Sequence, residues 1–215
     1  MERKNHESPQ GEVSGAFLLG MLGSFDKTNI IAIEDLPIPT DRLLPDAWYP
    51  YDYLINLFKY IEDKIPDSKG IMFWAGVKFI ELWYWDGPGK EIIFNSLDWV
   101  YCHDKGAGYN SAVRGENVGW ARNLETNEQL GFALIENIMP LPADYLRGIY
   151  FGGFYLFDDM AYYNTEIESS TIDHNFPFLR TVVKLTFKQS RPGFDKAKLG
   201  FTPGINAKEE NLTPQ

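Results

Sequence analysis

The chain has 215 residues, a formal net charge of −10 and a pI near 4.8, and 44% of its residues are hydrophobic. This length and hydrophobic content suit one domain with a real core. The acidic balance, without a compensating basic stripe, excludes nucleic-acid binding as a main role. A single cysteine, Cys102, excludes an intrachain disulfide framework and suits a reducing compartment.

The N-terminal sequence shows no secretory signal, and its apolar stretch at residues 16–22 is too short to span a bilayer. We therefore expect a cytoplasmic protein without a membrane span. Residues 1–12 are polar and are expected to form a flexible tail. Residues 13–190 should form one domain, and residues 191–215, rich in proline, glycine and charge, should form a second tail.

The first half of the domain is expected to be mainly helical. Apolar residues recur at helical spacing over residues 13–25, and a β-branched run at 30–33 predicts a short strand. Pro50 should open a helix that continues to residue 65. Residues 70–85 are apolar on almost every side and favour a central helix, and residues 92–103 predict a shorter one.

In the second half, apolar residues begin to alternate with polar ones, and the sequence predicts a β-β-α-β-β order. Residues 118–123 and 131–137 read as a hairpin, and residues 161–169 and 181–188 alternate as half-buried strands. Between the two pairs, Pro142 opens a helix that ends at residue 157. The predicted fold class is therefore α+β, with N-terminal helices packed on an antiparallel sheet and a C-terminal β-β-α-β-β unit.

The helix over residues 142–157 contains Gly148, Gly152 and Gly153. Each glycine costs about 1 kcal/mol of helix propensity relative to alanine. Close approach of the helix backbone to the sheet would compensate for this cost, and so would direct contact with a ligand. The apolar seam between this helix, the sheet and the helix over residues 70–83 is the predicted ligand pocket.

The element order and two local runs carry a resemblance. The runs are residues 114–120, Arg-Gly-Glu-Asn-Val-Gly-Trp, and residues 136–148, Glu-Asn-Ile-Met-Pro-Leu-Pro-Ala-Asp-Tyr-Leu-Arg-Gly. Over residues 45–190 the chain resembles the superfamily of haem nitric-oxide-binding sensor domains, 4-vinyl-reductase-type ligand domains and TRAPP transport-complex subunits. The resemblance implies a small-molecule-binding or assembly module more than an enzyme.

The haem branch of this superfamily uses a proximal histidine before the first hairpin, and His103 lies at about that place. The branch binds haem propionates through a Tyr-x-Ser-x-Arg motif. Here Tyr109, Ser111 and Arg114 are spaced one residue too far apart, which on a strand would turn Arg114 to the opposite face. His103 is therefore expected to be a surface or capping residue, with axial ligation of haem as the alternative.

The residues show no clear catalytic constellation. Cys102, His103 and Asp104 are adjacent and would point about 100° apart on a helix, so they should not converge on a metal ion. Cys102 is expected to be a buried thiol, and Glu81 to lie with Lys78 on the one exposed stripe of its helix, or else to be buried. No metal site is predicted apart from His103 as a weak candidate for a haem ligand, and the residues do not identify a cofactor.

The preferred hypothesis is a non-catalytic sensory domain that holds a hydrophobic small molecule between helix and sheet. The predicted lining residues are Trp74, Trp83, Trp120, Tyr150 and Phe154, with Arg147 as an orienting charge. The alternatives are an interaction protein that assembles through aromatic surface, as a homodimer or with a signalling partner, and a tetrapyrrole-related enzyme. Three arginines are candidate anchors for an anionic group of the ligand: Arg114, Arg122 and Arg147. Alternatively, each of them pairs with a nearby carboxylate, Glu116, Glu136 or Asp144.

Overall fold

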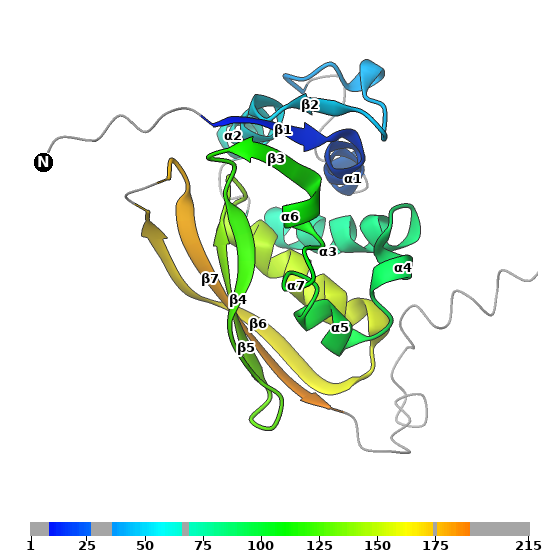
Figure 1. Cartoon of the computed structure of the whole chain (residues 1–215), viewed down its shortest axis with the longest axis vertical. Coiled ribbons are helices and arrows are strands. Elements are labelled where there is room, and N and C mark those ends of the chain that lie inside the picture. Colours follow the sequence, from blue (N-terminus) through cyan, green and yellow to red (C-terminus); the bar gives the residue numbers. More distant parts are fainter. Residues whose placement is uncertain (1–8, 27–35, 66–68, 174–175, 190–215) are drawn as a thin grey trace, which may run out of the picture.

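The computed structural model describes residues 9–26, 36–65, 69–173 and 176–189. The strand predicted at residues 30–33 lies outside these ranges. A four-stranded antiparallel sheet lies on one side of the molecule, with helices packed against one of its faces (Figure 1). A smaller three-stranded sheet and two helices form the other end. This arrangement confirms the predicted α+β class.

The larger sheet contains β4 (Trp120–Asn127), β5 (Phe132–Ile138), β6 (Met160–Ile172) and β7 (Leu179–Gln189). Its spatial order is β4-β5-β7-β6, and every neighbouring pair is antiparallel. The predicted hairpin and the two later strands are thus present. Side chains alternate between the two faces, and the face toward the helices is apolar, with four of its residues fully buried: Ala133, Ile135, Val183 and Leu185.

Helix α7 (Ala143–Phe157) lies between β5 and β6 in sequence, as predicted, and packs on α3 (Lys69–Trp85). The glycines of α7 make this approach possible. A Cβ on Gly148 would lie 1.9 Å from the carbonyl oxygen of Phe73 in α3, and a Cβ on Gly153 would meet the Trp99 indole. Close packing therefore explains the glycines, but the neighbours are α3 and an indole ring, not the sheet as expected.

The N-terminal part contains α1 (Gly15–Asp26) and α2 (Asp52–Lys64), close to the predicted ranges. A three-stranded sheet accompanies them, with β1 (Gln10–Ser14) paired between β2 (Trp48–Pro50) and β3 (Val113–Glu116). Residues 10–12 therefore belong to a strand, and the expectation of a flexible tail is wrong for them. The residue Pro50 ends β2 and does not open α2.

Three short helices connect α3 to β3: α4 (Gly89–Ile92), α5 (Ser96–Val100) and α6 (Tyr109–Ala112). The helix predicted at residues 92–103 is broken because Ile93 is extended, and the Asn95 side chain accepts a hydrogen bond from the Asp98 N–H to begin α5. A single 3-10 turn, η2 (Thr40–Arg42), precedes β2.

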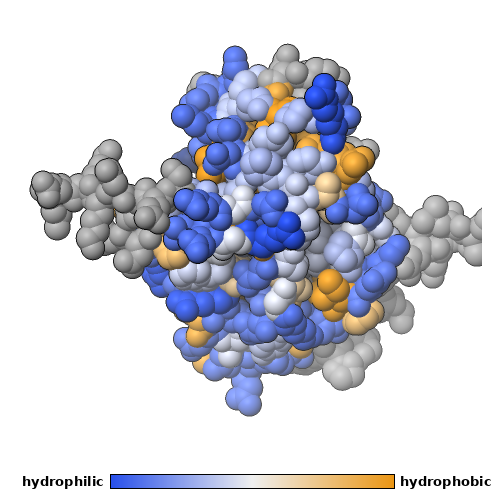
Figure 2. All heavy atoms as spheres, turned by 45° about the horizontal axis from the view of Figure 1, so that its top comes forward, coloured by the Kyte–Doolittle hydropathy of each residue, from blue (hydrophilic) through white to orange (hydrophobic). Residues whose placement is uncertain are grey.

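The visible surface is mostly polar, with small separate hydrophobic areas (Figure 2). Within the described ranges, the helices are all too short or too polar to cross a membrane.

Candidate functional site

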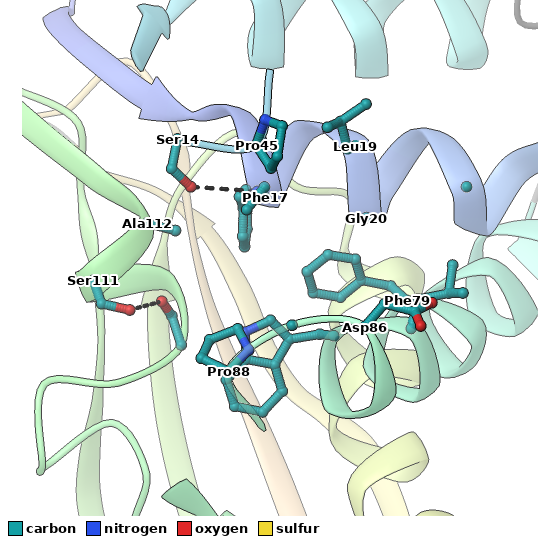
Figure 3. Close-up of a pocket in the computed structure, with 16 residues that line it drawn as sticks. Ser14, Phe17, Leu19, Gly20, Pro45, Phe79, Asp86, Pro88, Ser111 and Ala112 are labelled. Carbon is teal, nitrogen blue, oxygen red and sulfur yellow. Dashed lines mark hydrogen bonds between the residues drawn. The ribbon is translucent and has the colours of Figure 1, made fainter. Parts of the chain in front are cut away.

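A cleft of about 470 Å³ opens between α1, the C-terminal end of α3 and α6 (Figure 3). Helix α1 contributes Phe17 and Gly20 to its wall, and α3 contributes Phe79 and Trp83. The turn after α3 adds Asp86 at the rim. This volume lies within the usual range of small-molecule pockets, and the walls are mainly apolar and aromatic.

Two glycines of α1 line the cleft where α1 approaches α3 closely. A Cβ on Gly20 would lie 3.1 Å from the Phe79 ring, and a Cβ on Gly23 would lie 3.1 Å from a methyl carbon of Leu82. Larger side chains at these positions would project toward α3 and occupy the space between the helices.

A smaller chamber of about 30 Å³ lies deeper, between α3, α5, α7 and β5. Phe17, Phe79, Trp83 and Gly108 line both spaces, so these residues form the partition between them. The rings of Phe17 and Phe79 meet edge to face with centroids 5.2 Å apart. A chamber of this size has room for about one water molecule.

The chamber wall carries a buried chain of polar groups. The Tyr150 hydroxyl donates to Asn137 Oδ1 at 2.7 Å and lies 3.0 Å from His103 Nε2. The Tyr150 hydroxyl thus links the His103 ring to the Asn137 amide. The Nδ1 atom of His103 has no hydrogen-bond partner among the described residues. The Trp99 indole N–H donates to the backbone oxygen of Tyr150 at 3.2 Å.

Burial sets the protonation of this chain. His103 is only 6% exposed, and this burial lowers its pKa to about 4, although the nearby Asp104 charge acts in the opposite direction. Burial also raises the pKa of Tyr150 well above its ordinary value. Both groups are therefore neutral at physiological pH. The expectation that His103 is a surface or capping residue is wrong, because its position relative to α7 and β5 is a tertiary feature.

The neighbouring thiol behaves as expected. Cys102 is buried, and burial raises its pKa to about 12. Asp104 is exposed and accepts a hydrogen bond from the Asn123 side chain. Across the described ranges, no group of three or more histidine, cysteine or carboxylate side chains is arranged to hold a metal ion.

The structure brings together only some of the predicted lining residues. Trp83 borders both the cleft and the chamber, and Tyr150 borders the chamber. Phe154 is fully buried, but it packs between Tyr163 and Phe187 in the helix-to-sheet core, away from both spaces.

Three other predicted residues lie elsewhere. Trp74 is 57% exposed, so it does not line the interior. Trp120 donates its indole N–H to Glu136 on the sheet face opposite α7, because Glu136 precedes Asn137, which points toward α7. Arg147 pairs with Asp144 at 3.3 Å and lies over the Phe73 ring, so it does not orient a ligand in the cleft.

The residues of the broken Tyr-x-Ser-x-Arg pattern do not converge. Tyr109 and Ser111 lie on the helical turn α6 and not on a strand, and the Tyr109 hydroxyl contacts Tyr51 and the carbonyl oxygen of Val118. Arg114 lies on β3, where it pairs with Glu12 and stacks over the Trp48 ring. The three side chains therefore form no common site.

The predicted ion pairs are largely present. Arg122 and Arg180 both donate to the buried Glu136, at 2.5 and 2.6 Å, and Arg147 pairs with Asp144. Arg114 pairs with none of the three carboxylates considered, but with Glu12 of β1. Glu81 pairs with Lys78 at 2.6 Å on a partly exposed stripe of α3.

The cleft residues on α1 were not predicted from the sequence. Phe17, Gly20 and Gly23 follow one another at three-residue spacing, so an aromatic side chain and two vacant positions share one face of α1. This pattern was the available signal. It could not be assigned to a site because the sequence does not show that α1 faces the end of α3.

Comparisons with solved structures place this fold among known ones. An oxygen-binding H-NOX domain related to soluble guanylate cyclases has a TM-score of 0.62 and 16% identity, covering 85% of this chain and 97% of that one. A substituted H-NOX domain of T. Tengcongensis has a TM-score of 0.61 and 14% identity, and the match covers 82% of this chain and 98% of that one. A structure from work on H-NOX activation has a TM-score of 0.54 and 14% identity, and the match covers 84% of this chain and 96% of that one. No protein-family model and no curated protein sequence matches the chain. The chain thus has the fold of H-NOX domains at low sequence identity.

Proposed function

We propose that this chain is a non-catalytic binding domain that holds a hydrophobic small molecule in the cleft between α1 and α3. The observation that carries the proposal is a space of about 470 Å³ with aromatic walls from two helices and glycines on one of them. The H-NOX domains of the same fold include an oxygen-binding member, which supports a sensory role for this architecture.

The charge of the cleft indicates the class of ligand. Among the described residues that line it, Asp86 is the only one with a charged side chain, and none is a lysine or arginine. A carboxylate or phosphate on the ligand would therefore meet a like charge and no partner, which is unfavourable. The proposed ligand is uncharged or cationic, and its apolar part lies against Phe17, Phe79 and Trp83.

Haem, the cofactor named for H-NOX domains, does not fit the residues present. The chamber beside His103 holds about 30 Å³, and the aromatic rings of its lining fill the space around it. The Nε2 atom of His103 contacts the Tyr150 hydroxyl, and Arg114 is paired with Glu12 on the neighbouring strand of the smaller sheet. The chamber beside His103 therefore has no room for a macrocycle, and Arg114 is not free to anchor a propionate, so we propose a haem-independent ligand.

Ligand occupancy would act through the position of α1. Helix α1 follows directly from β1, the central strand of the smaller sheet, and the Gly15 N–H is tied to the Ala47 carbonyl oxygen before β2. A molecule between Phe17 and Trp83 would press α1 away from α3 and move this sheet with it. A partner that contacts the smaller sheet would then read the occupancy of the cleft.

Binding of an uncharged fluorescent dye tests this proposal. Nile red should bind the purified protein and brighten, while the anionic dye anilinonaphthalene sulfonate should bind at least tenfold more weakly because of Asp86. The substitution Gly20→Leu places a side chain in the cleft and should weaken Nile red binding at least tenfold.

Gly70→Leu is the matched control, because Gly70 also lies in a helix and a Cβ there meets nothing within 4 Å. It should leave the dye affinity unchanged. Equal affinity of the wild type and the two variants would mean that the dye binds elsewhere, and this result would reject the cleft as the site.

A further inference from the structure

The strand β6 (Met160–Ile172) is an edge strand of the larger sheet, and no other described strand pairs with its outer side. It is the longest strand described, with 13 residues, and it is the last strand in the order β4-β5-β7-β6. Its backbone pairs with β7 on one side. On the other side, no described residue forms a backbone hydrogen bond with it. Such an edge is a template for another strand.

The opposite edge of the same sheet, formed by β4, is capped by a side chain at Ala121. Asn110 of α6 accepts a hydrogen bond from the Ala121 N–H at 2.9 Å and donates to the Ala121 carbonyl oxygen at 2.6 Å. Its amide thus occupies the N–H and carbonyl groups that Ala121 would offer to a further strand. Asn123 also donates to the Val100 carbonyl oxygen beside this edge. The contrast shows that only one of the two edges is protected by such contacts in the described part of the chain.

The outer edge of β6 also lacks several of the residues that discourage pairing, although Glu166 and Glu168 are charged. The β6 sequence, Met-Ala-Tyr-Tyr-Asn-Thr-Glu-Ile-Glu-Ser-Ser-Thr-Ile, contains no proline, lysine or glycine. Register shifts occur between Met160 and Tyr162 and between Ile167 and Ser169. They bound a regular stretch of residues 162–167, which can pair without interruption.

We propose that β6 pairs antiparallel with β6 of a second copy of this chain, with a two-fold axis at Thr165. In an antiparallel pair, residues directly opposite each other point to the same face of the sheet. The two-fold axis must therefore pass between the two copies of one residue. With Thr165 opposite Thr165 of the second copy, Tyr163 faces Ile167 and Asn164 faces Glu166. The first pair joins two threonines, the second an aromatic and a β-branched side chain, and the third an amide and a carboxylate. Such pairs are favourable across strands.

The surroundings of the edge fit this register. On the helix face, the Tyr163 ring lies 5.2 Å from the Phe151 ring, and Phe151 stacks on the 54% exposed Tyr155. These aromatic side chains supply an apolar flank along the outer edge of β6. On the opposite face, Lys184 compensates the charge of Glu166 at 3.3 Å, so two copies of Glu166 can approach the same interface.

The occupant is a second copy because this stretch complements itself. An axis at Asn164 would instead place Tyr162 opposite Glu166, and it would lose the Tyr163 to Ile167 pair. Pairing about Thr165 produces the Tyr163 to Ile167 and Asn164 to Glu166 contacts twice each, which is characteristic of an isologous interface. The resulting assembly has one continuous eight-stranded sheet made from the four strands of each copy.

Sedimentation equilibrium with two opposite charge changes tests the pairing. Asn164→Glu places a carboxylate opposite Glu166 in two symmetric contacts and should raise the dimer dissociation constant about tenfold. Asn164→Lys should lower it by a similar factor. Thr171→Glu is the control, because Thr171 is exposed on the same strand beyond the regular stretch, and it should have no effect.

Cysteine cross-linking tests the register. Asn164→Cys and Glu166→Cys variants should form an intermolecular disulfide when mixed, at a yield well above that of either variant alone, since these positions face each other across the axis. A wild-type chain that stays monomeric at 100 µM would overturn the proposal. A dimer that responds equally to Asn164→Glu and Asn164→Lys would also overturn it, because it would place the interface elsewhere.

Discussion

Gly148 of α7 lies directly against the backbone carbonyl of Phe73 in α3, where an added Cβ would stand 1.9 Å from the oxygen. Because that oxygen belongs to the backbone, it cannot yield without separating the helices. We expect Gly148→Ala to destabilise the fold by about 1–3 kcal/mol or more, as for other overpacked cores. Gly70→Ala, where a Cβ meets nothing within 4 Å, should be neutral or slightly stabilising. Urea denaturation measures both, and equal midpoints would refute the packing role of Gly148.

The buried His103 predicts a loss of stability in mild acid. Burial lowers its folded-state pKa to about 4, below the ordinary value of about 6.5 expected in the unfolded chain. Between these values the unfolded state binds a proton that the folded state does not, so stability falls as the pH decreases from 6.5 to 4. The total change is about 3 kcal/mol.

The comparison variant for this effect is His103→Gln, whose amide can still form a hydrogen bond with Tyr150 but does not titrate. Its stability should be nearly independent of pH between 6.5 and 4.5, unlike that of the wild type. Parallel pH profiles for the two proteins in this window would contradict a buried neutral histidine.

Glu136 predicts a separate effect at lower pH. Burial alone would raise its pKa, but hydrogen bonds from Arg122, Trp120 and Arg180 outweigh burial and lower it. Glu136→Gln should therefore cost about 1–3 kcal/mol above pH 4.5, and this difference should shrink as the pH falls through the folded-state pKa. Glu168→Gln, at a carboxylate with 52% side-chain exposure, should cost less than about 0.5 kcal/mol. Equal costs for the two substitutions at pH 7 would argue against this ion-pair cluster.

Cys102 predicts slow thiol chemistry in the folded protein. The thiol is buried and its pKa is raised to about 12, so little thiolate forms and reagents do not reach it. Labelling with dithionitrobenzoate at pH 8 should follow the rate of unfolding and become fast in denaturant. Since this is the only cysteine of the chain, rapid labelling of the native protein would show directly that Cys102 is accessible.

The sequence predicted the larger sheet and α7 well because these elements have regular periodicity. It missed the smaller sheet, since β2 has only three residues and β1 pairs with β3 about 100 residues away. It placed Trp74 inside because α3 is apolar on nearly every side, and spacing then cannot show which face is exposed. The burial of His103 and the cleft between Phe17 and Trp83 depend on how distant helices meet, which local pattern does not specify.

The central claim is that the space between α1 and α3 holds an uncharged hydrophobic molecule. A crystal structure of the protein with Nile red bound tests it most directly. We expect the dye to lie between Phe17 and Trp83, in contact with Gly20 and with Asp86 at the rim of the cleft. Dye bound at another surface, with α1 and α3 unchanged around an unfilled cleft, would contradict it.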